Sequence, residues 1–149
     1  MKPLMTTSLV LALMLLTPPP VRANELALSV SPDDSVVQWG PCPAFFPDGC
    51  ELAVIHGDPA RPNADILFKI PGGYAFPAHW HTSAERMVLV SGEMSLTYQG
   101  QQPATLKTGM YAYGPAKAVH HGQCVSSEPC ILVIAFEAPV DAFEADESP

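Results

Sequence analysis

The chain has 149 residues, with 15 acidic residues against 7 basic ones and a formal net charge of −8 at pH 7. One domain of this length can bury a core of its own. The acidic balance argues against a nucleic-acid partner, because such partners select a basic protein surface.

The N-terminus carries the three parts of a secretory signal in order. A short positive region contains Lys2, residues 9–16 form an unbroken apolar run, and residues 21–23 offer a cleavage site. A membrane-spanning helix needs about 20 apolar residues, and this run is far shorter. We therefore predict a signal peptide over residues 1–23, a secreted or periplasmic protein, and no stable membrane anchor.

The four cysteines are spaced as two local pairs, and an even cysteine count in a secreted chain predicts disulfides. Four cysteines allow three pairings, of which the sequence favours Cys42 with Cys50 and Cys124 with Cys130. The alternative is a four-thiolate metal site, but such sites use closer Cys-x-x-Cys pairs. Each short loop would stabilise the fold by about 2–3 kcal/mol.

Short runs of β-branched and aromatic residues recur through the rest of the chain, and helical periodicity is absent. Seventeen prolines and ten glycines fit many tight connections between strands. We expect an all-β antiparallel sandwich or small barrel. The expected strands cover residues 36–39, 52–56, 64–70, 74–81, 85–90, 93–99, 109–113, 119–125 and 130–137.

Three histidines and one glutamate are placed to converge. His79 and His81 occupy positions i and i+2 of an expected strand, so both imidazoles project from one face. Glu85 opens the next strand, and His120 begins a histidine pair further along. Three imidazoles and a carboxylate suit a divalent transition metal. The alternative for an isolated His-x-His is a pair of partly exposed side chains on an edge strand.

Glycines frame these residues in two segments. Gly73 is followed by five residues, the His-x-His, three residues, Glu85, six residues and Gly92. Gly109 is followed by five residues and Pro115, with His120 five positions later. The two segments resemble the two signature motifs of the cupin superfamily. The second departs from the usual pattern, with Lys117 in place of glycine and Cys124 in place of asparagine.

The resemblance implies a double-stranded β-helix, or jelly-roll barrel, with a metal ion inside its mouth. It divides the chain into N-terminal strands and a disulfide loop (24–63), a cupin core (64–137) and an acidic, flexible tail (138–149). The implied metal ligands are His79, His81, Glu85 and His120.

The choice between His120 and His121 depends on the motif count. Adjacent strand residues point to opposite faces, so one of the pair reaches the metal and the count selects His120. A reversed pair, or a bulge that turns both inward, is the alternative. His56 lies outside both motifs and is expected at the surface.

Strand alternation extends the expected site. If Glu85 points inward, so do Met87 and Leu89, which predicts a partly apolar cavity. Tyr111 and Tyr113 share a face, and one phenol near the metal is a candidate catalytic group. The alternative is that both tyrosines are ordinary barrel packing.

Function is less constrained than the site. Cupins include dioxygenases, lyases, decarboxylases, isomerases and non-catalytic sensors, and the His79 segment is most similar to the cupin module of bacterial anti-sigma factors. We hypothesise a metal-dependent oxidoreductase of dioxygenase type, or a lyase, acting on a small organic molecule. The alternative is a non-catalytic periplasmic cupin that binds or senses a metal or ligand. Outside the cytoplasm Zn or Cu is favoured, with Fe, Mn and Ni as alternatives. A homodimer is the default expectation for this family.

Overall fold

The computed structural model describes residues 26–146, which form an all-β barrel. The predicted signal peptide lies outside the described residues, as do residues 147–149. Within residues 26–146, no helix is long and apolar enough to cross a bilayer. The strands of this part are β1 (Gly40–Pro41), β2 (Glu51–His56), β3 (Ala64–Ile70), β4 (Ala75–Trp80), β5 (Glu85–Ser91), β6 (Glu93–Tyr98), β7 (Ala104–Lys107), β8 (Tyr111–Gly114), β9 (His120–Cys124), β10 (Cys130–Phe136) and β11 (Phe143–Glu144).

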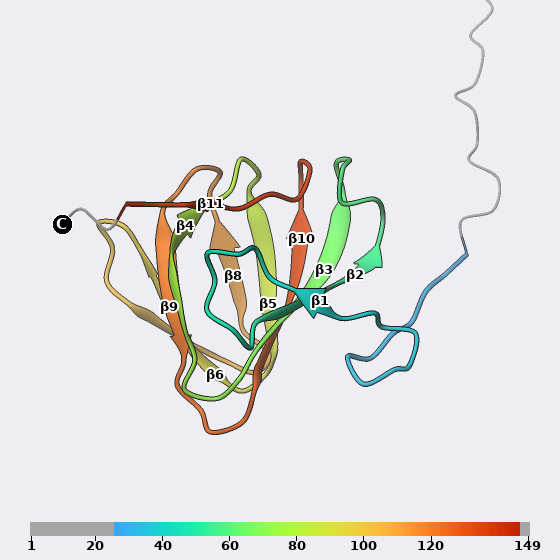
Figure 1. Cartoon of the computed structure of the whole chain (residues 1–149), viewed down its shortest axis with the longest axis horizontal. Coiled ribbons are helices and arrows are strands. Elements are labelled where there is room, and N and C mark those ends of the chain that lie inside the picture. Colours follow the sequence, from blue (N-terminus) through green and yellow to red (C-terminus); the bar gives the residue numbers. More distant parts are fainter. Residues whose placement is uncertain (1–25, 147–149) are drawn as a thin grey trace, which may run out of the picture.

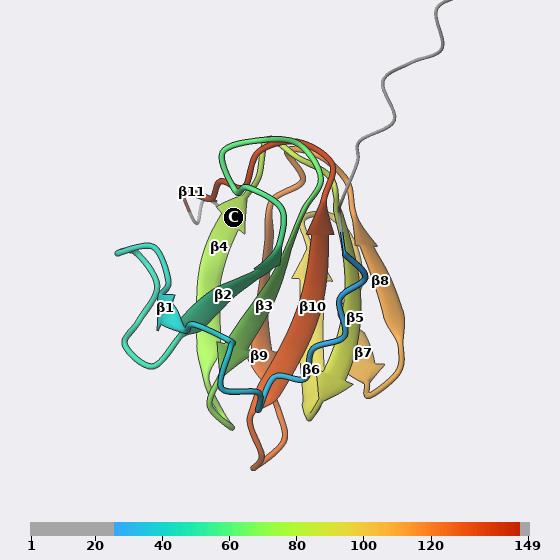
Figure 2. The ribbon, with the colours of Figure 1, turned by 90° about the vertical axis from the view of Figure 1, so that its right-hand side faces the viewer.

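The strands form two antiparallel sheets that face each other (Figures 1 and 2). One sheet has the order β1-β2-β3-β10-β5-β8, and the other has the order β11-β4-β9-β6-β7. Neighbours in each sheet are mostly distant in sequence, as when β10 lies between β3 and β5. This arrangement is the jelly-roll barrel that the sequence predicts.

The core lies between the sheets because alternate residues of each strand point inward. Along β10 buried and half-buried residues alternate without interruption, and β5 alternates buried with exposed residues over most of its length. Ile70, Leu89 and Met94 are fully buried at the centre. Each such side chain contributes about 1.5–3 kcal/mol to folding through burial alone.

Most strands form where the sequence predicts them, with three exceptions. The strand expected at 36–39 is absent, and the two-residue β1 lies just beyond it, paired with Leu52 and Glu51. Strands β7 and β11 were not expected. One of the four side chains of β7 is buried, and both side chains of β11 are exposed. Neither strand therefore has the alternating hydrophobic pattern that predicts a strand from sequence.

Both local cysteine pairs form disulfides in the structure: Cys42 with Cys50, and Cys124 with Cys130. The second pair is completely buried. Gly92, the last glycine of the first motif, lies against it with a φ of +80°. A Cβ on Gly92 would lie 2.8 Å from Cys130 Sγ, so both the backbone angle and the space require glycine.

The C-terminal segment, residues 138–146, follows a defined course across one end of the barrel (Figure 1), where the sequence predicts a flexible tail. The backbone N–H of Val140 donates to Pro59 O at 2.9 Å, and β11 pairs with the end of β4. Phe143 stacks on Trp80 with ring centroids 4.5 Å apart. Pairing and stacking therefore hold the described part of this segment, although its acidic composition indicates a solvated chain.

Candidate metal centre

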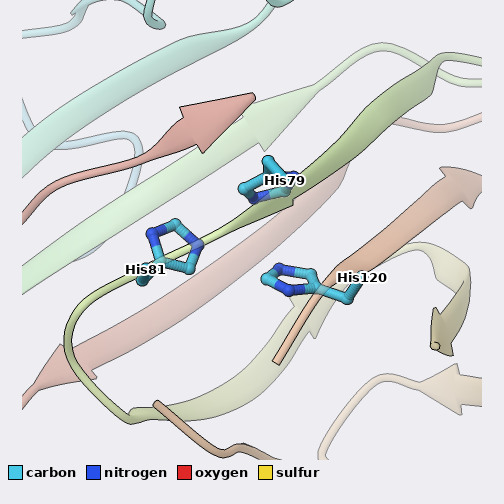
Figure 3. Close-up of side chains that lie close together, drawn as sticks. All are labelled: His79, His81 and His120. Atoms are coloured by element: carbon cyan, nitrogen blue, oxygen red, sulfur yellow. The ribbon is translucent and has the colours of Figure 1, made fainter. Parts of the chain in front are cut away.

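Three imidazoles come together from two strands of the smaller sheet. His79 lies on β4, His81 directly follows β4, and His120 begins β9, where it pairs across the sheet with His79. One ligating nitrogen from each ring lies within 4.8 Å of the others (Figure 3). All three side chains are buried. The antiparallel pairing of β4 with β9 thus brings together residues about forty positions apart in the chain.

The far nitrogen of each ring is held by the backbone. Nδ1 of His79 donates to Pro77 O at 2.9 Å, and Nδ1 of His120 donates to Ala118 O at 3.1 Å. Nδ1 of His81 donates to the carbonyl of Asp141, in the C-terminal segment. Because a carbonyl can only accept, each Nδ1 carries the proton and each Nε2 presents a lone pair. Such contacts fix the tautomer and orientation of metal-binding histidines.

Glu85 lies beside the three imidazoles at the start of β5, in the opposite sheet. Its carboxyl oxygens are 3.3 Å from His81 Nε2 and 3.7 Å from His120 Nε2. The side chain is 3% exposed. The structure therefore brings all four predicted ligands together, with the carboxyl group beside two of the three rings.

Burial keeps these groups uncharged in the absence of an ion. It lowers the pKa of His79 to about 4 and that of His120 to about 3, and it also lowers the pKa of His81. It raises the pKa of Glu85 to about 8. The contacts between Glu85 and the histidines are therefore between neutral groups at pH 7. Glu85 must therefore lose its proton before its carboxylate can bind a cation.

The donor set fits a divalent transition metal. Zn–N bonds are about 2.1 Å long, so the three nitrogens need to approach slightly closer than their present separations. Three neutral nitrogens and one carboxylate are borderline-to-hard donors, which accommodate Zn, Cu, Fe, Ni or Mn and leave coordination positions open.

The two remaining histidines lie away from this cluster. His121 is exposed on β9, on the opposite face from His120. His56 lies on β2 with its Nδ1 3.5 Å from a carboxylate oxygen of Asp65. The inward position of His120 agrees with the motif count.

The two tyrosines chosen from the sequence do not face the site. Tyr111 and Tyr113 on β8 are 57% and 50% exposed, and neither lines the cavity beside the histidines. The prediction that one of these phenols lies near the metal is therefore wrong. Alternation puts the two on one face of β8, and Ala112 and Gly114 take the inner one.

Tyr98, which no motif or strand pattern in the sequence singles out, lies closer to the metal centre. Its ring is 5.0 Å from that of His120, centroid to centroid. A Cβ on Gly114 would lie 2.4 Å from the Tyr98 hydroxyl and 3.0 Å from Glu85 Oε2, so a glycine makes room for both groups. Desolvation and the nearby Glu85 raise the pKa of Tyr98. Tyr98 is the last residue of β6, and nothing in the sequence around it predicts its contact with His120.

A cavity of about 160 Å³ opens from the histidine cluster into the barrel. Met87 lines it, as predicted, and Leu89 is buried deeper in the core. The disulfide loop closes one side of the cavity, since Phe46 packs edge-on against His79 with centroids 5.0 Å apart. Asp141 and its neighbours in the C-terminal segment close another.

Comparisons with known proteins agree with this architecture. Residues 66–136 match the profile of the cupin domain family. No curated protein sequence matches the chain significantly.

Several solved structures share this fold. The DMSP lyase DddQ from Ruegeria pomeroyi has a TM-score of 0.64 at 19% identity, over 76% of this chain and 64% of that one. A structure of the DMSP lyases RdDddP and RnDddQII has a TM-score of 0.65 at 16% identity, over 74% and 63%. Oxalate decarboxylase from Bacillus subtilis has a TM-score of 0.57 at 18% identity, over 65% and 28%.

These similarities support a common fold alone. Sequence identities of 16–19% do not indicate a shared activity. The chain spans 63% and 64% of the length of the two lyase chains. Residues 66–136 therefore match the cupin domain family, and their jelly-roll topology agrees with that match.

Proposed function

We propose that this protein binds one divalent transition metal through His79, His81, Glu85 and His120, and acts there on a small organic molecule as an oxidoreductase of dioxygenase type. The observation that carries the proposal is the set of three buried imidazoles, each with Nδ1 hydrogen-bonded to a backbone carbonyl, at the wall of a largely apolar cavity. A purely structural metal site needs no adjoining cavity.

The protein's own groups have separate tasks in this proposal. The backbone carbonyls keep the three Nε2 atoms directed at one point. Glu85 gives up its proton when the cation arrives and supplies the negative charge. A bound redox-active ion supplies the activation of substrate and O₂, and the apolar cavity excludes bulk water from them.

We further propose that the protein matures in an oxidising compartment. Two disulfides within residues 26–146 suit a secreted or periplasmic protein. The affinity order of divalent metals then favours Zn or Cu in the isolated protein, with Fe, Mn or Ni as the other candidates. A zinc-filled site would favour lyase chemistry over oxidation, because Zn²⁺ is not redox-active.

The test compares metals on one protein. Samples loaded separately with Fe(II), Cu(II) and Zn(II) are given small organic substrates, and O₂ uptake is recorded. Uptake that depends on both the substrate and a redox-active metal supports the oxidoreductase. His120→Ala should abolish it, whereas His121→Ala, on the outer face, should retain it.

Other outcomes assign the protein differently. Substrate cleavage without O₂ uptake, equally fast with Zn(II), identifies a lyase. Tight ligand binding without turnover under every metal supports the non-catalytic binding protein.

A further inference from the structure

The cavity beside the histidines has a polar end and an apolar body. Its polar lining residues are His79, His81, Glu85, His120 and Asp141. The rest of the wall is almost entirely hydrocarbon, including Phe46, Phe68, Phe76, Met87, Leu132 and Ile134. Among the described residues, no lysine or arginine lines it.

The acidic groups of the wall are already engaged. The Asp141 carboxylate accepts hydrogen bonds from the Thr82 backbone N–H, at 2.8 Å, and from the Thr82 hydroxyl. The Glu85 carboxyl group lies against His81 and His120. Beyond the metal centre, therefore, the wall offers no donor from a lysine or arginine, and its one further carboxylate, that of Asp141, is already hydrogen-bonded to Thr82. Burying a charged group without a partner against the hydrocarbon part of the wall costs about 1–3 kcal/mol.

Three phenyl rings form one continuous part of this wall. Phe68 packs edge-on against Phe76 with centroids 5.7 Å apart, and Phe46 lies 6.2 Å from Phe68. The rings pack against one another as a hydrophobic surface. A ligand body that contacts them gains through apolar area removed from water, about 25 cal/mol per Å².

The volume indicates the size of the body that fits inside the cavity. The cavity measures about 160 Å³. A dry cavity of about 150 Å³ lined by leucine, isoleucine and phenylalanine holds one benzene molecule. The space therefore accommodates a single ring or a short branched alkyl group.

We propose that the ligand of the metal centre has one oxygen-donor head and a compact, uncharged, apolar body about the size of benzene. The head meets the ion at the histidine cluster, and the body occupies the space between the phenyl rings and β10. This inference rests on the proposed function and specifies its substrate class. It places molecules with a second charged group outside that class.

Four probes with the same head test it on the Co(II)-loaded protein. Acetate is the head alone, and tert-butylacetate adds an apolar body. Betaine has nearly the same shape with a positive charge, and succinate carries a second negative charge. Binding is followed by the visible absorption of Co(II) and by calorimetry.

We expect tert-butylacetate to bind at least about tenfold more tightly than acetate, betaine or succinate. Tighter binding of betaine would show that the phenyl rings receive a cation, and tighter binding of succinate would reveal an anion site. Either result, or equal affinity for all four, overturns the inference.

Variants at two neighbouring residues test where the apolar body of the ligand lies in the cavity. Met87 lines the cavity, whereas Val88 beside it on β5 faces outward and is 36% exposed. Met87→Ala should shift the preference from benzoate toward the larger naphthoate by about tenfold, and Val88→Ala should leave the ratio unchanged. An unchanged ratio in folded Met87→Ala contradicts the assigned position. If Met87→Ala does not fold, the four-probe series on the wild type still decides.

The inference and the proposed function fail separately. A protein that shows no Co(II) absorption has no metal centre, and the proposed function is lost. A protein that binds Co(II) but ranks the probes differently keeps its metal centre and loses only the proposed substrate class.

Discussion

At the scale of single residues, Glu85 should couple metal binding to proton release. Burial raises its pKa to about 8, so at about pH 7 the metal-free protein holds a proton there that a cation must displace. The imidazoles have lowered pKa values and release none. Calorimetry in buffers of different ionisation enthalpy should show about one more proton released on Zn(II) binding by the wild type than by Glu85→Gln.

The pH dependence of this proton release follows from the raised pKa of Glu85. Above the raised pKa, at about pH 10, Glu85 is already ionised and the difference between the two proteins should vanish. A difference that persists there would show that the proton comes from elsewhere.

Tyr98 should have opposite effects on folding and on metal binding. Within the described residues its hydroxyl is buried without a hydrogen-bond partner, which destabilises the metal-free fold. An ionised Glu85 offers it an acceptor once a metal is bound. We expect Tyr98→Phe to leave the free energy of unfolding unchanged or raised, and to weaken Zn(II) affinity by about tenfold.

Tyr113 on the outer face provides the matched control for Tyr98. Denaturant unfolding of the metal-free proteins and a competitive Zn(II) titration measure the two effects. Equal Zn(II) affinity in Tyr98→Phe and Tyr113→Phe would refute a role for the buried hydroxyl.

Lys117 occupies a position where the cupin motif usually has glycine, and the structure explains the preference. Its φ is 63°, in the left-handed region, and its N–H donates to His81 O at 2.7 Å. A side chain costs about 1–2 kcal/mol in this conformation. Lys117→Gly should raise the free energy of unfolding by about 0.5–1 kcal/mol, after the extra chain entropy of glycine is subtracted.

Lys107, an exposed lysine in β7, is the control for Lys117. There the same change to glycine should lower stability by a similar amount, about 0.5–1 kcal/mol. Chemical unfolding of both variants checks this. If both changes lower stability, Lys117 is not strained.

Strand alternation predicted correctly whether a side chain points into or out of the barrel where a sequence motif identified the inward-facing residue. The motif placed His120 inward, and alternation then put His121 outside. For Tyr111 and Tyr113 alternation gave a shared face without saying which one, and the outer face was the correct answer. Tyr98 lies opposite His120 in the pairing of β6 with β9, and this register cannot be read from the pattern of either strand alone.

At the scale of elements, the C-terminal segment has a structural role at the metal centre. The carbonyl of Asp141 accepts from His81 Nδ1, while its side chain is anchored to Thr82. Composition predicts only a solvated acidic tail, because a short segment held by backbone contacts has no hydrophobic pattern. Likewise, β7 and β11 lack a buried row that a periodicity search could find.

Loosening this anchor should weaken the site without unfolding the barrel. Asp141→Ala removes both hydrogen bonds to Thr82, so the carbonyl that orients His81 is held less firmly. We expect Zn(II) affinity to fall by about tenfold. Asp146→Ala, an exposed change in the same segment, should leave it unaltered. Similar affinities for both variants in a chelator competition would contradict this role.

At the scale of the whole molecule, the sequence predicted the barrel, both disulfides and the grouping of the four ligands. The disulfides follow from the spacing within two short loops and the barrel from strand patterns, whereas the grouping of the ligands followed from the resemblance of two segments to the cupin motifs. The shape of the cavity did not follow, since it is formed by side chains from both sheets, the disulfide loop and the C-terminal segment. Function depends on that cavity, so it was the least accessible to sequence reasoning.

Elemental analysis decides whether the chain holds one metal ion on His79, His81, Glu85 and His120. Protein matured in an oxidising compartment should contain about one transition-metal ion per chain, mainly zinc or copper. His120→Ala should lose most of that metal, and His121→Ala, its exposed neighbour, should retain it. A wild-type protein without bound metal, or equal metal contents in the two variants, would contradict the account.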